Sequence, residues 1–566
     1  MRARRLTMAF ALIAALAPAA MAQVIHGTVT SAVANGRVPG AVVLLRDSSL
    51  TYARALTSDS GTFTIGAGVP GRYYLRVMRI GFRPTESAVF DLRRDTTVAL
   101  TLTDIPVFLP EVATRDRGDC HVHTDTSSAA TATATFTLWE QAKTALFAAA
   151  ITLEGRDYRF AKLMNVRSYD TKHRQLRDVS LRELEAEGTA PWASWPAEKF
   201  RRDGYVTEDD SGMTFSAPDL DVLLSPYFAE EHCFRLTASS APTPSELGLD
   251  FEPAHSPKHV EIRGTLWLDS ASTELRSLTF TYVNLPISVS RGDTVLGGRV
   301  SFERLATGAW ILPSWSIRMP IALRTLHTAS MRGLGSMPVN AGRQGRWRLT
   351  TDVVRVAGGD LRAVKRGDSA QTAIWQRPTG SVRVFAALSA DTNANPAAGA
   401  IVRLVGSPYE ANAGADGRLR FDQVLPGDYL FEATTPLHEI IGSVGARVAV
   451  TAKPNELIEA RVNLIPLAAA AATVCQVDAL EKSRAVVAGR VWLSDSTLAP
   501  RTRVTVEWPG GDAHADTRDD GTFRICNVPT GTHLLIKASR GSELATADVT
   551  IAPGDIVQPL VLRLSR

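Results

Sequence analysis

Long apolar runs are almost absent from this 566-residue sequence. The clearest one, residues 8–17, is too short to span a bilayer and follows three arginines. With Ala20 and Ala22 behind it, the pattern predicts a signal peptide over residues 1–22 that is removed on export; the alternative is an uncleaved anchor. No later run reaches about 18 apolar residues, so we predict no transmembrane segment in the mature chain.

The sequence also has no excess of either charge. Without the three leader arginines, 59 basic residues face 58 acidic ones. Proteins that bind nucleic acid through a broad surface normally carry a clear basic excess. We therefore expect no nucleic-acid partner, and no motif indicates a cofactor.

Cysteine is scarce. The chain has four cysteines: Cys120, Cys233, Cys475 and Cys526. Export makes disulfides possible, and four cysteines allow three pairings. Membership of the same expected domain favours bonds between Cys120 and Cys233 and between Cys475 and Cys526.

The sequence does contain a short motif that occurs three times. Each copy has a turn that contains Asp and Gly, then a strand, then a second glycine near a proline. The two glycines are ten residues apart each time: Gly61 and Gly71, Gly417 and Gly427, Gly521 and Gly531. Because Asp can bond its own backbone and Gly accepts positive φ, these residues predict turns and strand entries in three copies of one module.

The first copy has the fullest pattern of strands. Short apolar or alternating segments at 24–30, 41–45, 62–65, 73–77 and 97–102 are separated by Gly and Pro turns, which is typical of a β-sandwich. The segment resembles the carboxypeptidase regulatory-like domain. The residues that carry this resemblance are Gly27, Gly61, Phe63, Pro70, Gly71, Tyr73 and the segment 81–84.

This resemblance implies a mainly β protein with transthyretin-like, prealbumin-like β-sandwiches over residues 23–105, 380–465 and 475–566. Such modules accompany metallocarboxypeptidases, outer-membrane receptors and secreted adhesins, so the fold does not fix the function. The peptidase itself is not expected, because none of the eleven histidines is followed at the third position by glutamate. A G-x-S-x-G turn and a P-loop are also absent, and we predict that the protein is not an enzyme.

Residues 106–370 differ from the modules. Residues 137–146 place Leu138, Ala142 and Leu146 on one face of a helix, whereas later segments alternate as half-buried strands do. Those segments are 263–269, 275–282, 298–305 and 310–320. We predict a central α+β domain with a curved antiparallel sheet and one main helix, loosely similar to the half-barrels of periplasmic lipoprotein carriers. Residues 362–378 and 467–473 are interpreted as linkers or loops.

Residues 119–125 contain an H-x-H pair that resembles the opening motif of polymerase-and-histidinol-phosphatase metal hydrolases. The further ligands and the parallel barrel of that family are not indicated, so no metal or catalytic residue is predicted. A narrower hypothesis joins Cys120, His121 or His123 with His232 and Cys233 in one zinc site. Export favours the disulfide over this site.

Two other patterns have ordinary structural explanations. His255 and His259 are one helical turn apart, but Pro257 lies between them and predicts a loop. Arg-Gly-Asp occurs at 117–119, 291–293 and 366–368. It can be interpreted as an adhesion signal or simply as an exposed turn, which these residue types favour.

Several tryptophans could stack on sugar rings, although tryptophan in strands more often packs in a core or at its rim. They are Trp139, Trp267, Trp310, Trp315 and Trp508. Trp508 is the best exposed candidate, because a Pro-Gly-Gly turn follows it.

Together these patterns predict an exported, non-catalytic binding or structural protein of the cell envelope, in the periplasm, at the outer membrane or outside the cell. The expected partner is an unidentified protein or glycan. One alternative is carbohydrate or peptide binding by the sandwich loops. The others use the central domain, either as a lipid carrier, which requires an apolar cavity, or as a metal-dependent hydrolase, which requires converging histidines and carboxylates.

Overall fold

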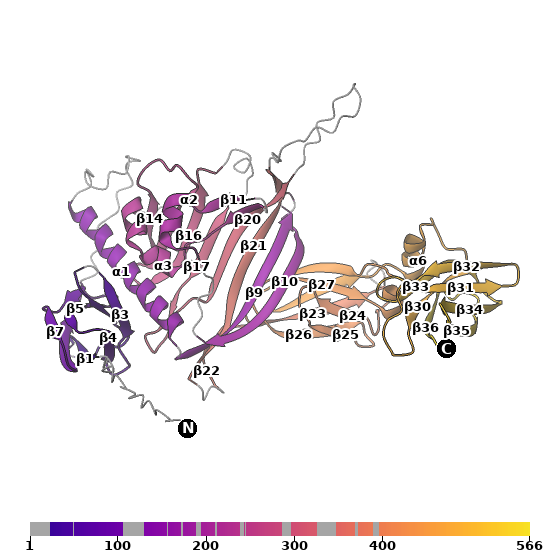
Figure 1. The fold of residues 1–566 in the computed structure, drawn as a ribbon, viewed down its shortest axis with the longest axis horizontal. Coiled ribbons are helices and arrows are strands. Elements are labelled where there is room, and N and C mark those ends of the chain that lie inside the picture. The colour runs from indigo at the N-terminus through magenta and orange to yellow at the C-terminus, as the bar shows by residue number, and fades with distance from the viewer. Residues whose placement is uncertain are drawn as a thin grey trace, which may run out of the picture.

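The computed structural model describes residues 23–105 and 129–565, apart from some internal positions. Those positions are 35, 49, 156, 171, 173, 188–193, 210–211, 238–242, 244, 286–295, 325–346, 368–371 and 389–394. The expected signal peptide at 1–22 therefore lies outside the described residues, as do Cys120, His121 and His123. Strands make up most of the part that is described (Figure 1).

Residues 23–102 form a β-sandwich, as predicted. Alternation drives the packing: in β4, Phe63 and Ile65 are buried while Thr62 and Thr64 are exposed. One sheet has the order β4-β1-β8 and the other β3-β2-β5-β6, with β7 paired to β5. The strands are β1 Gln23–Ser31, β2 Val42–Arg46, β3 Thr51–Leu56, β4 Thr62–Ala67, β5 Gly71–Met78, β6 Thr85–Glu86, β7 Phe90–Leu92 and β8 Thr96–Leu102.

The two later copies of the motif build sandwiches with the corresponding strand order. The second pairs β26-β23-β29 and β25-β24-β27-β28; the third pairs β33-β30-β36 and β32-β31-β34-β35. The strands of the second are β23 Gly380–Ala387, β24 Ile401–Leu404, β25 Glu410–Asn412, β26 Arg418–Val424, β27 Gly427–Thr434, β28 Ala446–Ala452 and β29 Leu457–Asn463. Those of the third are β30 Arg484–Trp492, β31 Arg503–Trp508, β32 Gly511–Asp516, β33 Thr522–Pro529, β34 His533–Arg540, β35 Glu543–Thr550 and β36 Val557–Arg563.

The first glycine of each motif has the same structural role. Gly61, Gly417 and Gly521 have φ of 69°, 71° and 67°, a region that glycine enters at little cost. The carbonyl of each accepts a hydrogen bond from the first long strand of its own sandwich. The donors are the N–H groups of Val29, Ala386 and Val491, at 2.9, 2.8 and 2.9 Å. The repeated motif is therefore a structural turn.

The central domain is built on one antiparallel sheet. Its order is β10-β9-β21-β20-β17-β16-β15-β14-β13, with β22 paired to β21 (Figure 1). The strands are β9 Tyr158–Asp170, β10 Leu176–Glu187, β13 His232–Thr237, β14 Glu246–Pro253, β15 Glu261–Asp269, β16 Leu275–Val283, β17 Gly297–Ser301, β20 Ser314–Arg324, β21 Trp347–Arg366 and β22 Ala373–Gln376. Two small hairpins join β11 Val206–Asp209 to β12 Gly212–Phe215 and β18 Glu303–Arg304 to β19 Trp310–Ile311.

Helices cover one face of this sheet. The predicted helix is present but longer than expected, as α1 Ala129–Glu154, because alanines extend it on both sides. Leu138, Leu146 and Leu153 of α1 belong to the same buried core as Leu266 and Leu278 of the sheet. Three short helices complete this layer: α2 Ala197–Asp203, α3 Leu220–Leu224 and α4 Pro226–Glu231.

The two segments interpreted as linkers or loops lie between domains, but neither is an irregular loop. Residues 467–473 lie in a helix, α6 Leu467–Cys475, because alanine has the highest helix propensity and Ala470, Ala471 and Ala472 are buried against neighbouring strands. Residues 362–378 contain the end of β21 and all of β22, which extend the central sheet. Burial gives regular structure to α6, whereas pairing with β21 gives it to β22.

The sandwiches lie at the two ends of the central domain (Figure 1). The first packs on α1, where Val42, Leu44 and Met78 enter the central core. Arg76 forms an ion pair with Glu140 at 2.8 Å. The outer face of one sheet of the first sandwich therefore packs into the central core, while the sandwich keeps an interior core of its own.

The second sandwich packs on β9 and β10, and its core includes Leu163, Val179 and Leu181 of those strands. The third packs on the second through α6 and through α5 Pro436–Ile440. Ile441, which directly follows α5, is fully buried in one cluster with Val486 of the third sandwich. A disulfide joins Cys475 at the end of α6 to Cys526 on β33, with Cα atoms 5.9 Å apart.

Among the described residues, the helices are all too short or too polar to cross a membrane.

Candidate functional site

A cavity of about 660 Å³ opens on the face of the central sheet that α1 does not cover. Its lining comes from β13 to β17, β20 and β21. Strand alternation explains the difference between the two faces. In the helix-covered face, Leu249, Leu266, Leu278 and Val300 lie opposite one another on successive strands. Their neighbours along each strand point the other way and are mostly polar, among them Asp250, Thr265, Thr279 and Arg299.

Register aligns these polar residues in two rows across the sheet. The first row runs through Arg235, Asp250, Thr265, Thr279, Arg299 and Ser316, each directly opposite the next. The second row runs through Arg263, Thr281, Gly297 and Arg318. We call the surface formed by these two rows the arginine face.

Some charges of this surface are already paired. Arg235 forms an ion pair with Glu252. Asp250 accepts a hydrogen bond from the Thr265 hydroxyl at 2.6 Å, and burial raises the pKa of its carboxyl.

Other charges remain available. Among the described residues, Arg299 has one long contact, of 3.4 Å, to the Ser277 hydroxyl. Within the part of the chain that the structure describes, Arg263 and Arg318 have neither an ion-pair nor a hydrogen-bond partner, and both are exposed. The cavity therefore offers free positive charge beside hydroxyl groups.

Two aromatic rings support the floor of the cavity from the helix-covered side. Phe251 and Phe280 belong to the buried core there, and each lies opposite a glycine of a neighbouring strand. A Cβ atom on Gly298 would lie 2.5 Å from the Phe280 ring, and one on Gly264 would lie 2.7 Å from the Phe251 ring. These glycines are therefore needed to seat the rings, as aromatic and glycine pairs across strands often are.

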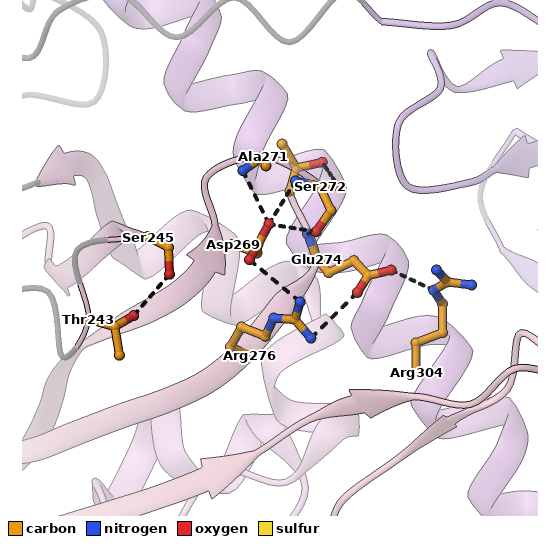
Figure 2. A network of polar contacts seen from close by, with 9 residues as sticks. Thr243, Ser245, Asp269, Ala271, Ser272, Glu274, Arg276 and Arg304 are labelled. Atoms are coloured by element: carbon orange, nitrogen blue, oxygen red, sulfur yellow. Dashed lines mark hydrogen bonds and ion pairs between the residues drawn. The ribbon is translucent and has the colours of Figure 1, made fainter.

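A second charged cluster lies at the β15–β16 turn (Figure 2). Asp269 accepts from the N–H groups of Ala271 and Ser272 and from the Ser272 hydroxyl, and these bonds lower the pKa of its carboxyl. Glu274 contacts Arg276 at 3.6 Å and Arg304 at 2.6 Å. The carboxylates of Asp269 and Glu274 are both engaged within the protein, so we interpret this network as structural.

Arg79 of the first sandwich lies near the same network. Burial beside Arg304 lowers the pKa of Arg79 to about 10, and Glu274 opposes the effect. The network therefore contributes to the contact between the first sandwich and the central sheet.

A third polar group is buried beneath α2 and α4. The Tyr227 hydroxyl donates to Glu261 at 2.9 Å, and burial raises the pKa of Glu261 to about 7. Tyr205 is fully buried, and its hydroxyl has no hydrogen-bond partner among the described residues. Tyr205 and Tyr227 are buried in the core, and Glu261 is half-buried beside them.

The structure separates His232 from Cys233. His232 is 2% exposed, stacks on Phe228 at 4.4 Å, and burial lowers its pKa to about 4. Cys233 is disulfide-bonded and lines the cavity on the opposite face. Consecutive strand residues point to opposite faces, which argues against a shared zinc site. In the described part of the chain, no group of three His, Cys, Asp or Glu side chains is arranged to hold a metal.

The remaining candidates are dispersed. His255 and His259 lie in the exposed loop between β14 and β15, as predicted. Arg-Gly-Asp at 117–119 and 291–293 lies outside the described residues, whereas Arg366 ends β21 and contacts Asp59 at 3.8 Å.

The tryptophans mostly serve packing. Trp139, Trp267 and Trp310 are buried, and Trp315 and Trp508 are half-buried. Trp508 packs over Gly511, where a Cβ atom would lie 3.2 Å from the indole, so it is less open than the turn suggested.

The arginines of the cavity are the residues that sequence reasoning missed. Three of them, Arg263, Arg299 and Arg318, occupy polar positions of strands that the sequence did predict. A single strand gives no sign that its polar face is hollow, so only the pairing of the strands brings these side chains together.

The sheets and turns define a mainly β protein with three transthyretin-like sandwiches and a central α+β domain. Residues 24–103 match the family model of the carboxypeptidase regulatory-like domain. No curated protein matches the chain significantly.

Solved structures that align with the chain have low overall similarity. The 5-hydroxyisourate hydrolase of Klebsiella pneumoniae is 14% identical over 15% of this chain and 92% of its own, with a TM-score of 0.13. The minor pilin GBS52 of Streptococcus agalactiae is 13% identical; the alignment covers 33% of this chain and 97% of the pilin, with a TM-score of 0.14. The TIE protein of Bacillus anthracis is 9% identical; the alignment covers 71% of this chain and 83% of the TIE protein, with a TM-score of 0.14. TM-scores this low support no functional conclusion.

Proposed function

We propose that this chain is an exported, non-catalytic binding protein of the cell envelope. In this proposal the three sandwiches are supports, and the central domain presents the binding site. The observation that carries the proposal is the cavity of about 660 Å³ on the arginine face. Ligand pockets typically have volumes of about 300–1,000 Å³, so the size is suitable.

The way the cavity is held also supports a binding role. Apart from the edge strand β13, the strands that line it are interior strands of a large sheet, each paired on both sides. The first sandwich shares a core with the helices behind this sheet, and the second packs on β9 and β10 at its far edge. A site on rigid strands loses little conformational entropy when a ligand binds.

The chemistry of the lining favours binding over catalysis. Hydroxyls and guanidinium groups predominate, and the carboxylates of Asp250 and Glu252 are engaged with Thr265 and Arg235. Nucleophilic catalysis needs a hydroxyl or thiol activated by a base. The described lining places no histidine beside a hydroxyl.

Export is supported by the leader pattern and by the disulfide between Cys475 and Cys526. Structural disulfides persist in oxidising compartments and are rare in the cytosol. The proposed location is the periplasm, the outer membrane or the exterior.

Lipid carriage has less support. The space between α1 and the sheet is filled by a continuous core of side chains. A hollow on that side, beside Phe160, Leu312 and Trp315, has a volume of only about 20 Å³. A lipid tail needs far more room than one water molecule occupies.

Binding to a glycan array and a peptide library tests the proposal. We expect the full mature chain to bind a defined subset of ligands, and Thr281→Trp, which fills the cavity floor, to abolish that signal. Thr97→Trp, on an exposed strand position of the first sandwich, is the matched control and should bind like the wild type. A silent array, or a signal that Thr281→Trp leaves unchanged, would contradict the proposal.

A further inference from the structure

We propose that the arginine face binds an acidic oligosaccharide, a sugar chain that carries carboxylate groups. This inference rests on the proposed binding function and specifies its ligand. Three observations support it: the positions of the available arginines, the hydroxyl groups near them, and the strands below, whose main-chain groups are already hydrogen-bonded.

The arginines form two separate positions for anions. Arg299 lies opposite Ser316, and Arg318 is two residues further along the same neighbouring strand. Such diagonal neighbours have backbones about 7–8 Å apart, so two long side chains can reach one carboxylate. Arg263 lies three strands from Arg318, at about 14 Å when strands are spaced by about 4.8 Å. Two anionic groups on one extended ligand match this arrangement.

The net charge of the cavity has the right sign. Four arginines line it, against the two acidic residues Asp250 and Glu252. Guanidinium groups bind carboxylates through two parallel hydrogen bonds, which gives direction as well as affinity.

The surface between the two arginine positions fits sugar hydroxyls. Thr281 and Ser316 carry hydroxyls that can both donate and accept. The Thr265 hydroxyl already donates to Asp250 and can still accept, and the Thr279 hydroxyl accepts from the Trp267 indole N–H and can still donate. The carboxylate of Asp250 has oxygens that can accept from ligand hydroxyls as well. A ligand with carboxylates alone would use only the arginines.

An acidic peptide fits this surface less well. Extended peptides are usually bound by adding a strand to a free sheet edge, where unpaired N–H and C=O groups are available. The strands β14, β15, β16, β17 and β20 all have partners on both sides. Arg263, Arg299 and Arg318 all belong to these strands, whose main-chain groups are occupied, so a ligand at these arginines must be held by side chains. The edge strand β13 contributes only Cys233 and Arg235 to the lining.

Isothermal titration of the full mature chain with hexagalacturonate tests the inference. We expect binding that weakens as salt is raised, because charge–charge attraction is screened. The monosaccharide galacturonate should bind at least about tenfold more weakly, since it spans only one anion position. A neutral glucose hexamer should not bind detectably.

Arg263→Gln combined with Arg318→Gln should reduce the affinity for hexagalacturonate at least about tenfold, because each charged pair contributes to binding. Both side chains are exposed and without partners among the described residues, so folding should be unaffected; thermal melting checks this. Arg355→Gln is the matched control. It lies on β21 opposite Met319, on the other face of the sheet, and should bind within about twofold of the wild type.

Several outcomes would overturn the inference. These are no binding of hexagalacturonate at about 1 mM, equal affinity in the double variant, or equal binding of the neutral hexamer. Tighter binding of polyglutamate would assign the face to an acidic peptide instead. If a neutral glycan binds and Thr281→Trp abolishes that binding, the proposed function stands while the acidic ligand is wrong.

Discussion

Glu261 is held in a place where its ionisation is unfavourable. Its carboxyl accepts from Tyr227 and lies among buried tyrosines, and burial raises its pKa from 4.5 to about 7. Between those values the folded protein holds a proton that the unfolded chain has released. The stability from this group is therefore full below about pH 4.5 and is lost as the pH rises through about 7.

His232 has the opposite dependence. Burial lowers its pKa from 6.5 to about 4, so the folded ring stays neutral where the unfolded one is charged. Its contribution is present above about pH 6.5 and is lost as the pH falls towards 4. Between about pH 4 and 7, Glu261 therefore stabilises the fold more at the lower pH and His232 more at the higher pH.

We predict that Glu261→Gln raises the melting temperature at pH 8 and that the gain shrinks at pH 5. At pH 8 the wild-type carboxyl is ionised in a half-buried position, whereas glutamine stays neutral. Scanning calorimetry at both values measures the difference. Glu481→Gln, at an exposed position of the third sandwich, is the control and should change little. An equal shift at both pH values would contradict this explanation.

The sandwich elements depend on the turn at the first motif glycine. At Gly61 the φ is positive, and a Cβ atom would meet the Val29 carbonyl oxygen at 2.9 Å. Both the backbone conformation and the close approach exclude larger residues. The same two constraints apply at Gly417, where the distance to the Ala386 carbonyl oxygen is 2.5 Å.

Gly61→Ala should destabilise the first sandwich by about 1–3 kcal/mol, the usual cost of a strained backbone conformation. Hydrogen exchange in β1 and β4 measures this local opening without interference from the other domains. Gly68→Ala is the matched control, because a Cβ atom there would have no neighbour within 4 Å, and it should stay within about 0.5 kcal/mol. Comparable loss of protection in both variants would show that the turn has no special role.

Among the elements, the sandwich strands and turns followed from local sequence, while α6 did not. Alternation in β4 and the Asp-Gly turn before it are local signals. The alanine-rich sequence of α6 is compatible with a loop or a helix. In the structure its alanines pack in one buried cluster with Ile441 and Val486. Helix propensity is weak over so short a stretch, so burial decides the structure.

At the scale of the whole molecule, Arg167 joins the central sheet to the second sandwich. Its side chain donates to the Asp428 carbonyl at 2.7 Å and to Asn165 at 2.6 Å, and it lies 5.6 Å from the centre of the Tyr429 ring. Nearby, the Leu181 N–H donates to the Gly406 carbonyl at 2.7 Å across the same interface. Hydrogen bonds from a buried charge are among the stronger ones in proteins.

Arg167→Ala should loosen this interface and speed exchange of the Leu181 amide by about tenfold or more, the effect of losing roughly 1.5–3 kcal/mol of charged hydrogen bonding. Hydrogen exchange read by mass spectrometry measures it. Arg177→Ala, at an exposed position of β10, should leave that amide unchanged. Unaltered protection in Arg167→Ala would mean that apolar packing alone holds the second sandwich.

The sequence by itself determined the local features of this protein. Three equal glycine spacings predicted three sandwiches, because Gly61, Gly417 and Gly521 adopt a φ that few other residues tolerate. Alternation also placed Arg263, Arg299 and Arg318 on the polar sides of their strands.

Only the tertiary structure decided that these arginines share one cavity. Alternation fixes the face of a residue within its own strand, but the register between strands depends on turn lengths and core packing. Here the buried leucines opposite α1 set that register, and the arginine face follows from it.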